Sequence, residues 1–495
     1  MHTTLPTRRR VLRLAAVAFA AGLVMSVAPL PNWSFVPVAS ATVEPLGRLR
    51  PMSPVAVAAL ADEVAEAAAD VPRVSALEER TDSFRMIGVA LEEEPDEPVL
   101  VRVLDEDGTW GEWNELEIDA DKGPDPGTPE ARAAAEAAGR VVSEPLWVGE
   151  ARGYEISLAG DDADGAEVAL VREEVRRTLT DAVPLAEAAL PAPFGINSRA
   201  SWGARAPKDT PSIARDGLKL AVVHHTAGTN NYSAAQVPSI IRSMQAFHMD
   251  TNGWSDLGYN FVVDKFGGIW EGRAGGTANA VVGAHAAGFN TGSVGVSVMG
   301  NYSGQYASSA ALEAVSRVVG YRLQEYGAHP QHRVNFTSGG GTKYPAGKVV
   351  NLPRVIGHRD VGQTACPGLI YNNLGSIRNR AAQWYQLMEA IATPRGSIDS
   401  VKVTGNRVDV VGWAIDPDVP QPARVHVVLA GRLQEVQANG YRPDVGRAYP
   451  GVGDHRGWGA GFSGLPKGRH RLCVTVINQG EGNDKLLGCQ DVVVK

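Results

Sequence analysis

The chain has 495 residues, which is too long for one ordinary domain and predicts about three. With 44% hydrophobic and 21% charged residues, its composition excludes a fibrous or wholly disordered protein. The formal net charge of −8 argues against nucleic acid as a partner, because a phosphate backbone requires a surface rich in Lys and Arg.

Residues 1–41 have the features of an export signal. The basic stretch Arg8–Arg10 is followed by an apolar run, Leu14–Leu30, and by Ala39-Ser40-Ala41, which fits an A-x-A cleavage site. The alternative is an uncleaved membrane anchor, but the apolar run is short for a spanning helix. We therefore expect the signal peptide 1–41 to be removed and the protein to be extracellular or cell-wall associated. The arginines also resemble a twin-arginine export signal.

An Ala- and acid-rich segment, 42–80, precedes a stretch in which apolar and polar residues alternate. Runs such as Val99–Leu104 have the period-2 pattern of strands, which predicts an N-terminal β domain over 81–176. Its acidic, Pro- and Ala-rich insert, Asp119–Arg140, is interpreted as a solvated loop. The Ala/Pro stretch 177–195 is interpreted as a linker.

Residues 196–392 alternate between strand-like and helix-like segments. The strand-like runs are Leu218–Val223, Tyr259–Val263 and Val294–Met299; the helical ones are Ala234–Phe247, Ala310–Tyr326 with Ser309 as the expected cap, and Leu374–Ala392. Strands interleaved with helices predict a central α/β domain, in which helices flank a mixed β-sheet.

Residues 397–495 return to strand-like runs separated by Gly, Pro and Asp, which predicts a C-terminal β-sandwich-like domain. Cys473 and Cys489 lie close together in this domain and most simply form a disulfide in an exported protein. Cys366 is then left without a cysteine partner. An unpaired thiol outside the cell needs burial or a metal ion to protect it.

Three residues of the central part have the chemistry of metal ligands. His224 follows the buried run Leu218–Val223, His358 follows the strand-like run Val355–Gly357, and Cys366 lies eight residues further on. Two imidazoles and one thiolate suit Zn²⁺, and three protein ligands leave a fourth position open, as in catalytic zinc sites. The spacing forms no compact motif, so the alternative is three unrelated residues, each satisfied in the core.

Four segments resemble motifs of the peptidoglycan recognition protein and type-2 N-acetylmuramoyl-L-alanine amidase family. They are Val222–Gly228 (VVHHTAG), Asp256–Phe261 (DLGYNF), Val282–His285 (VGAH) and Gly357–Pro367 (GHRDVGQTACP), in this order within 196–392. The chain is identified on these motifs as a member of the family, and its flanking domains are similar to those of exported actinobacterial members. The resemblance implies a zinc amidase domain over 196–392.

The resemblance also implies roles for individual residues. It assigns one Zn²⁺ per chain to His224, His358 and Cys366, and catalytic roles to Tyr259 and Thr364. Phage members of the family have lysine at the position of Thr364, so this chain is similar to the recognition-protein branch there. Members that only bind peptidoglycan usually lack the cysteine at position 366.

Further residues are implied to surround the substrate. The resemblance assigns substrate binding to His285, Asn290 and Arg273, although loop capping explains Asn290 and Arg273 equally well. His225 alternates with His224 along a strand and therefore faces the opposite way, which favours packing. His248 is also expected to be structural.

The resulting hypothesis is an N-acetylmuramoyl-L-alanine amidase, a zinc hydrolase that cuts the amide between N-acetylmuramic acid and L-alanine of peptidoglycan. One alternative is a non-hydrolytic peptidoglycan-binding module, and another is a zinc amidase acting on a different acylated amine. The expected partner is peptidoglycan, with neither nucleic acid nor a membrane span after signal cleavage. Cell-wall attachment through the C-terminal domain is a further hypothesis.

Overall fold

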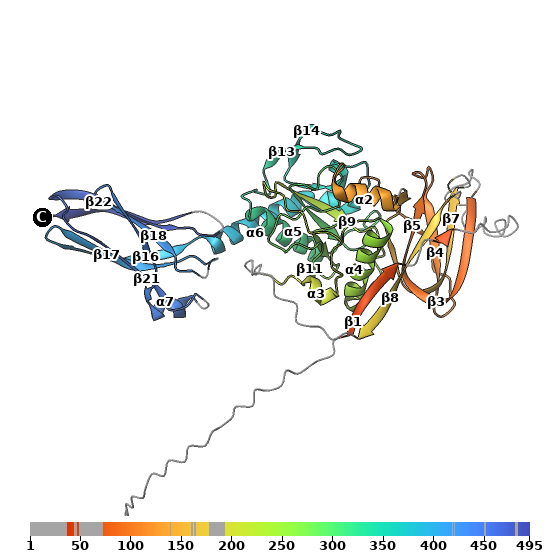
Figure 1. Ribbon diagram of the computed structural model, residues 1–495, viewed down its shortest axis with the longest axis horizontal. Coiled ribbons are helices and arrows are strands. Elements are labelled where there is room, and N and C mark those ends of the chain that lie inside the picture. Colours follow the sequence, from red (N-terminus) through yellow and green to blue (C-terminus); the bar gives the residue numbers. More distant parts are fainter. Residues whose placement is uncertain are drawn as a thin grey trace, which may run out of the picture.

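The chain folds into three domains that lie in a row, with the C-terminal domain at one end and the N-terminal domain at the other (Figure 1). The computed structural model describes residues 37–43, 47–48, 73–138, 140–159, 162, 165–177, 194–417, 419, 421–449, 452–480 and 484–495. Most of the expected signal peptide, 1–41, lies outside the described residues. None of the helices among the described residues is long and apolar enough to cross a membrane.

The N-terminal domain is an antiparallel sheet in the order β1-β8-β3-β7-β4-β5, with β2 beside β8 and β6 beside β3. The strands are β1 (Pro37–Val43), β2 (Gly47–Arg48), β3 (Arg73–Leu91), β4 (Val99–Asp105), β5 (Asn114–Leu116), β6 (Val141–Val142), β7 (Leu146–Ala159) and β8 (Glu167–Arg177). The sheet therefore begins upstream of the range 81–176 predicted for it.

The expected cleavage position after Ala41 falls inside this folded sheet. Strand β1 pairs along its whole length with β8, and the side chain of Ala41 is buried. Cleavage after Ala41 would remove five of the seven residues of β1.

The insert Asp119–Arg140 is not the solvated loop that its composition predicted. It contains helix α2 (Pro129–Ala138), and the Thr128 hydroxyl caps this helix by accepting a hydrogen bond of 3.1 Å from the Ala131 amide. Four of its charged residues are buried: Asp119, Asp121, Lys122 and Asp125. Charged residues are buried only when they are paired, and the partners here come largely from the central domain.

The central domain has a mixed sheet in the order β11-β10-β12-β9-β15, as the α/β prediction requires. Its strands are β9 (Leu220–His225), β10 (Phe261–Val263), β11 (Ile269–Glu271), β12 (Ser293–Val298) and β15 (Val355–Gly357); a separate hairpin contains β13 (Arg333–Thr337) and β14 (Val349–Pro353). Only β11 is antiparallel to its neighbour.

Helices cover both faces of this sheet. They are α3 (Arg199–Trp202), α4 (Val237–Ala246), α5 (Ser309–Gln324) and α6 (Leu374–Ala392), with short helical turns η2 (Ala234–Gln236), η3 (Phe247–Thr251), η4 (His358–Asp360) and η5 (Gly368–Asn373). Helices α5 and α6 pack on one face, through Ala221 and Val223 of β9. Alternation along the strand turns Leu220 and Val222 to the opposite face.

Two predicted helices need correction at their ends. Helix α5 is capped by Ser308 and not by Ser309, because the Ser308 hydroxyl accepts a hydrogen bond from the Ala311 amide. The predicted helix Ala234–Phe247 is divided into η2, the shorter α4 and the wider turn η3.

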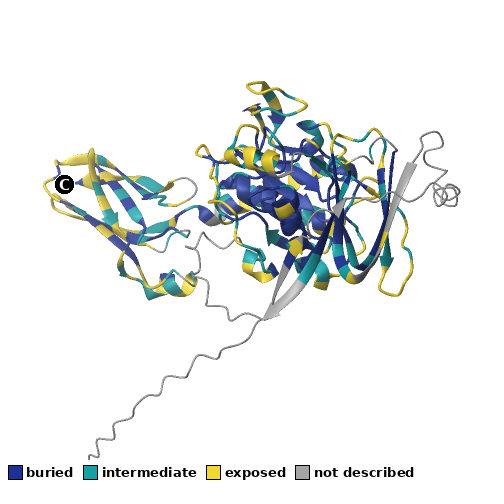
Figure 2. Ribbon diagram, turned by 45° about the vertical axis from the view of Figure 1, so that its right-hand side comes forward, coloured by how far each residue is buried: buried dark blue, intermediate teal, exposed yellow. Residues whose placement is uncertain are grey.

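The N-terminal sheet and the central domain share one hydrophobic core. Met86, Trp147 and Val171 of the sheet belong to the same buried cluster as Ile241 and Phe247 of the central domain. Figure 2 shows buried residues continuing from the central domain into this sheet.

Gly88 of β3 faces the Phe247 ring of this shared core. A Cβ atom at Gly88 of β3 would lie 2.5 Å from Cζ of Phe247, so only glycine lets the aromatic ring approach this closely. The contact fixes how the two domains are docked.

The C-terminal domain consists of two four-stranded sheets, β16-β17-β21-β20 and β19-β18-β22-β23, around one core. Its elements are β16 (Arg395–Thr404), β17 (Arg407–Ile415), β18 (Arg424–Leu429), β19 (Arg432–Gln437), β20 (Gly440–Tyr441), α7 (Pro443–Ala448), β21 (His455–Phe462), β22 (Gly468–Ile477) and β23 (Lys485–Val494). The expected disulfide joins Cys473 and Cys489 on the neighbouring strands β22 and β23.

Candidate metal centre

The fold brings the three predicted metal ligands together. His224 lies near the end of β9, His358 follows the end of the neighbouring strand β15, and Cys366 lies on the loop after η4. Parallel strands present their carboxyl ends at one edge of a sheet, so the two histidines meet there. One ligand atom from each of His224, His358 and Cys366 lies within 4.8 Å of the others, and Nδ1 of His224 is 3.7 Å from Sγ of Cys366.

These donors fit a zinc ion. Tetrahedral Zn²⁺ with Zn–N of about 2.0 Å and Zn–S of about 2.3 Å places a nitrogen and a sulfur ligand about 3.5 Å apart, close to the observed distance. All three side chains are fully buried. Burial lowers the pKa of His224, which keeps its ring neutral and its lone pair available. Burial raises the pKa of the Cys366 thiol, so a thiolate here requires a nearby cation.

The ring of His285 lies behind His224. Nδ1 of His285 is 3.0 Å from Nε2 of His224, the ring nitrogen that points away from Cys366. Burial lowers the pKa of His285, so its ring is also neutral. This contact fixes the orientation of His224 and leaves Nδ1 free for a metal. The predicted substrate-binding residue His285 thus contacts a ligand side chain.

Tyr259 lies beside the ligands. Its ring centroid is 5.6 Å from that of His224, and its hydroxyl is buried without a hydrogen bond of acceptable geometry to any described residue. Burial raises the pKa of Tyr259, which keeps the hydroxyl protonated and able to donate. The Thr364 hydroxyl accepts a hydrogen bond of 3.1 Å from the Cys366 amide and is only partly buried.

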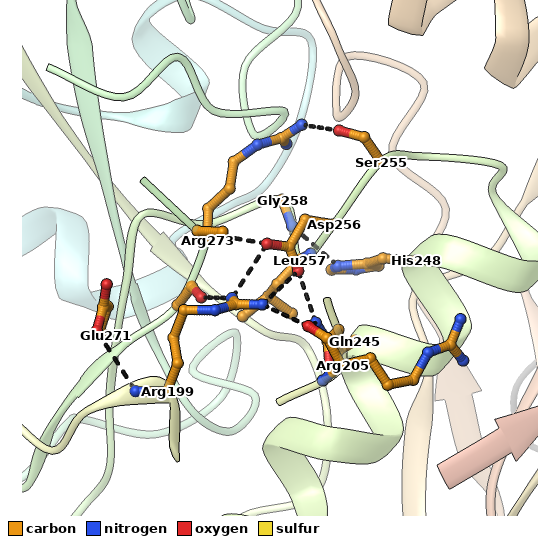
Figure 3. Close-up of polar contacts among 12 residues, drawn as sticks. Arg199, Arg205, Gln245, His248, Ser255, Asp256, Leu257, Gly258, Glu271 and Arg273 are labelled. Atoms are coloured by element: carbon orange, nitrogen blue, oxygen red, sulfur yellow. Dashed lines mark hydrogen bonds and ion pairs between the residues drawn. The ribbon is translucent and has the colours of Figure 1, made fainter. Parts of the chain in front are cut away.

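Asp256 holds the loop that presents Tyr259. Its carboxylate accepts hydrogen bonds from Gln245 Nε2 at 2.7 Å and from the Leu257 amide at 2.8 Å, and it pairs with Arg199 Nη1 at 3.0 Å (Figure 3). A fourth donor is the Ala274 amide at 2.8 Å. The carboxylate is buried and fully paired, so it fixes the loop from several directions.

Asn290 and Arg273, the other two predicted substrate-binding residues, contact the N-terminal domain. Asn290 Nδ2 donates to Asp125 Oδ1 at 2.9 Å, while its Oδ1 accepts from the His285 amide at 2.8 Å. Arg273 forms an ion pair with Glu130. Both side chains are buried, and their charged partners belong to the N-terminal insert.

Sequence reasoning missed the residues that this insert brings to the centre. Asp119 Oδ2 lies 3.1 Å from His358 Nδ1. Lys122 Nζ lies 2.8 Å from Glu144 and 5.5 Å from the centroid of the Tyr259 ring. Burial alone would lower the pKa of Lys122, but Glu144 and then Asp119 raise it, so the side chain is an ammonium cation.

His225 and His248, the two histidines expected to be structural, contact neighbouring residues. Nδ1 of His225 accepts from the Tyr302 amide at 3.1 Å, and Nε2 lies 3.2 Å from Glu117. Nδ1 of His248 accepts from the Gly258 amide at 3.2 Å. These contacts agree with the structural roles expected for both residues.

Two parts of the chain match known families. Residues 215–369 match the family described as N-acetylmuramoyl-L-alanine amidase, and residues 39–180 match the family described as Rv3811 N-terminal galactose-binding domain-like. The second match extends over the N-terminal sheet and the insert.

Individual relatives are similar to part of the chain. Peptidoglycan-recognition protein SC2 of Drosophila melanogaster is 34% identical over 187 residues, which is 37% of this chain and 86% of the relative. The N-acetylmuramoyl-L-alanine amidase of Homo sapiens is 33% identical over 175 residues, 35% of this chain but only 26% of that protein. A solved structure of human PGRP-IBETAC in complex with glycosamyl muramyl pentapeptide is 27% identical, with a TM-score of 0.29, over 37% of this chain and 95% of that one.

The relative from Drosophila is covered over most of its length at an identity above 30%, and residues 215–369, matched by the amidase family, contain all three clustered residues. The chain therefore belongs to the peptidoglycan recognition protein and type-2 N-acetylmuramoyl-L-alanine amidase family.

Proposed function

We propose that the protein is a zinc-dependent N-acetylmuramoyl-L-alanine amidase that hydrolyses the amide between N-acetylmuramic acid and L-alanine of peptidoglycan. The observation that carries the proposal is the convergence of His224, His358 and Cys366 at one buried point. Three protein ligands are the number that catalytic zinc sites use, whereas structural sites use four.

The residues around the centre have the properties that amide hydrolysis needs. A bound Zn²⁺ would polarise the amide carbonyl and lower the pKa of water to about 7. Tyr259, whose hydroxyl is protonated and buried, can donate to the oxyanion that forms as the carbonyl is attacked. The Thr364 hydroxyl accepts a hydrogen bond from the Cys366 amide, which holds it beside this residue. From there it can orient a neighbouring polar group.

We further propose that the protein is exported and acts on the cell wall. This rests on the basic and apolar sequence within 1–41 and on the disulfide between Cys473 and Cys489, which is typical of oxidising compartments. N-terminal sequencing of the protein recovered from culture medium and cell wall would identify the mature end. A protein found only in the cytoplasm would contradict export.

The activity is tested by prolonged digestion of purified sacculi with the full chain. Mass spectrometry should find stem peptides with new free L-alanine amino termini, separated from intact glycan, and a chelator should abolish them until zinc is restored. Release of no peptide by a protein that still sediments with sacculi would instead establish a binding module.

Cys366→Ser provides the matched variant, because a serine hydroxyl is a poor zinc ligand at neutral pH. We expect the zinc content to fall from about one per chain to a small fraction of that, together with loss of product. The double variant Cys473→Ser/Cys489→Ser should keep its zinc. Full zinc content in Cys366→Ser would remove this cysteine from the ligand set.

A further inference from the structure

The residues Glu117–Glu130 of the N-terminal domain, here called the acidic segment, cover the metal centre. The ligands His224, His358 and Cys366 and the neighbouring Tyr259 are all fully buried. A peptidoglycan strand cannot reach a centre that is covered in this way. Figure 1 shows the adjoining helix α2 lying over the central domain.

Asp121 attaches the acidic segment to one side of the centre. Its carboxylate accepts hydrogen bonds from the Thr342 amide at 2.9 Å and from the Gln363 amide at 2.6 Å, and it also contacts the Thr342 hydroxyl. Gln363 lies in the same loop as the ligand Cys366, so this anchor is next to the metal centre.

Asp125 and Glu130 attach the segment on other sides. Asp125 accepts from the amides of Asn290 and Thr291, both at 3.0 Å, and from the Thr291 hydroxyl at 2.7 Å. Glu130 accepts from the Ser255 amide at 2.9 Å and pairs with Arg273. Three carboxylates of one segment thus bind several separate loops around the centre.

Asp119 reaches the ligands themselves. Its Oδ2 is 3.1 Å from Nδ1 of His358, although the two atoms do not form a hydrogen bond of acceptable geometry, and the Thr364 side chain is a further polar neighbour of the carboxylate. Two buried polar atoms at this distance are close enough to bind one metal ion. Zn–N and Zn–O distances of about 2.0–2.2 Å place such a pair about 3.3 Å apart.

The other ring nitrogen of His358 faces away from this group. Nε2 faces Gly362, where a Cβ atom would lie 3.2 Å from it, and it has no hydrogen-bond partner among the described residues. Nδ1 faces Asp119, so a metal ion shared by the two side chains would bind at this nitrogen.

We propose that Asp119 is a fourth protein ligand of the metal and that the acidic segment holds most of the amidase in a closed form without activity, so that the wild type cleaves slowly. The loss of activity in the closed form rests on the proposed function. A carboxylate in the fourth position displaces the water that hydrolysis requires. Activation requires the segment to leave the centre.

The contacts allow the segment to leave without separating the domains. The segment is attached by hydrogen bonds and ion pairs to loops, whereas the sheet is docked through the apolar cluster that contains Met86 and Phe247. Breaking the polar contacts of the segment leaves that cluster intact.

The coordination is tested on the full chain loaded with Co²⁺ in place of zinc. The visible spectrum of the wild type should not change between about pH 6 and 9, because no water is bound. Asp119→Asn and Asp119→Ala should acquire a pH-dependent spectrum as water replaces the carboxylate, while Asp107→Asn, in an exposed turn, should resemble the wild type. A wild-type spectrum that titrates like that of the Asp119 variants would overturn the assignment and leave Asp119 as a hydrogen-bond partner of His358.

Closure is tested with the double variant Asp121→Asn/Asp125→Asn, which keeps the shape of both anchors but weakens their charge-assisted bonds. We expect faster hydrogen exchange over Glu117–Glu130 and cleavage of a soluble muropeptide about tenfold faster than in the wild type or in Asp107→Asn. Equal or slower cleavage by the double variant would contradict closure.

The two proposals fail in different ways. If the segment opens in hydrogen exchange, and the Co²⁺ spectrum of the double variant begins to titrate, but no variant releases peptide, then the amidase function is wrong and the metal role of Asp119 stands. If the wild type cleaves as fast as the double variant, the function stands and the closed form is wrong.

Discussion

Nδ1 of His285 lies 3.0 Å from Nε2 of His224, so one candidate metal ligand is positioned by a second buried ring. Such a contact selects the tautomer of the ligand and fixes the direction of its lone pair. It also distinguishes His285 from the ligands themselves, because its removal should weaken metal binding without removing a donor atom.

The first prediction concerns this contact. His285→Phe keeps an aromatic ring of similar size but removes the nitrogen that meets His224. We expect zinc affinity to fall by about 10–100-fold, the usual effect of losing a partner that orients a ligand. Competition with a fluorescent chelator measures this directly. Unchanged affinity would show that His224 needs no partner, and a complete loss of zinc would make His285 a ligand.

The second prediction concerns the Tyr259 hydroxyl. Tyr259→Phe should lower kcat by about 10²–10³ with little change in KM, since losing one donor to an oxyanion has this effect. Thermal stability should not fall, because the hydroxyl makes no hydrogen bond of acceptable geometry within the described part of the chain.

Tyr302→Phe is the matched control and should show the opposite pattern. The buried Tyr302 hydroxyl donates to the Met299 carbonyl at 3.0 Å, so its loss should cost about 1 kcal/mol of stability and leave kcat unchanged. A Tyr259→Phe enzyme with wild-type kcat would exclude an oxyanion role.

The third prediction concerns the Asp256 network of Figure 3. Asp256→Ala leaves the partly buried Arg199 and the amide groups around it unpaired, and should cost about 3–5 kcal/mol, the range for breaking a buried pair. Asp250→Asn breaks the partly exposed pair with Arg205 and should cost below about 1 kcal/mol. Urea denaturation measures the free energy of unfolding of both variants. A similar loss in both would mean that the burial of Asp256 contributes little to stability.

The fourth prediction concerns pH and the contact between α5 and α6. Hydrogen bonds from Arg380, and secondarily from Trp384 and Arg317, lower the pKa of Glu313 from its ordinary value of 4.5. A lowered pKa in the folded state means that the carboxylate stabilises the fold above pH 4.5, and that this contribution is lost as the pH falls through the folded-state pKa.

Glu313→Gln should therefore lower the melting temperature at pH 7 more than at about pH 3. The exposed Glu93→Gln is the control and should have no effect at either pH. An equal loss at both pH values would show that the side chain acts through packing and not through its charge.

The sequence predicts the two candidate histidine ligands because each lies at the end of a strand. The apolar run that ends before His224 and the run Val355–Gly357 before His358 identify two buried parallel strands, whose ends must meet at one edge. Similarly, the alternation of Val99–Leu104 and the interleaved helices were sufficient to predict the types of the N-terminal and central domains.

The sequence does not predict what covers the centre. Asp119 and Asp121 lie more than 200 residues from His358 and Gln363, and no local pattern shows that an acidic residue will find a partner so distant. An acidic, Pro-rich stretch usually remains in solvent. One local signal was available: Thr128-Pro129-Glu130 before an Ala-rich run is a helix cap followed by proline, and it predicts α2.

The close approach of Phe247 to Gly88 limits how this architecture can be rearranged. A central domain expressed without the N-terminal sheet would expose the apolar face of α4 and the Phe247 ring to water, which favours aggregation. The two domains are therefore not interchangeable modules. Fusions or truncations designed to recover this protein in soluble form should keep the two domains together.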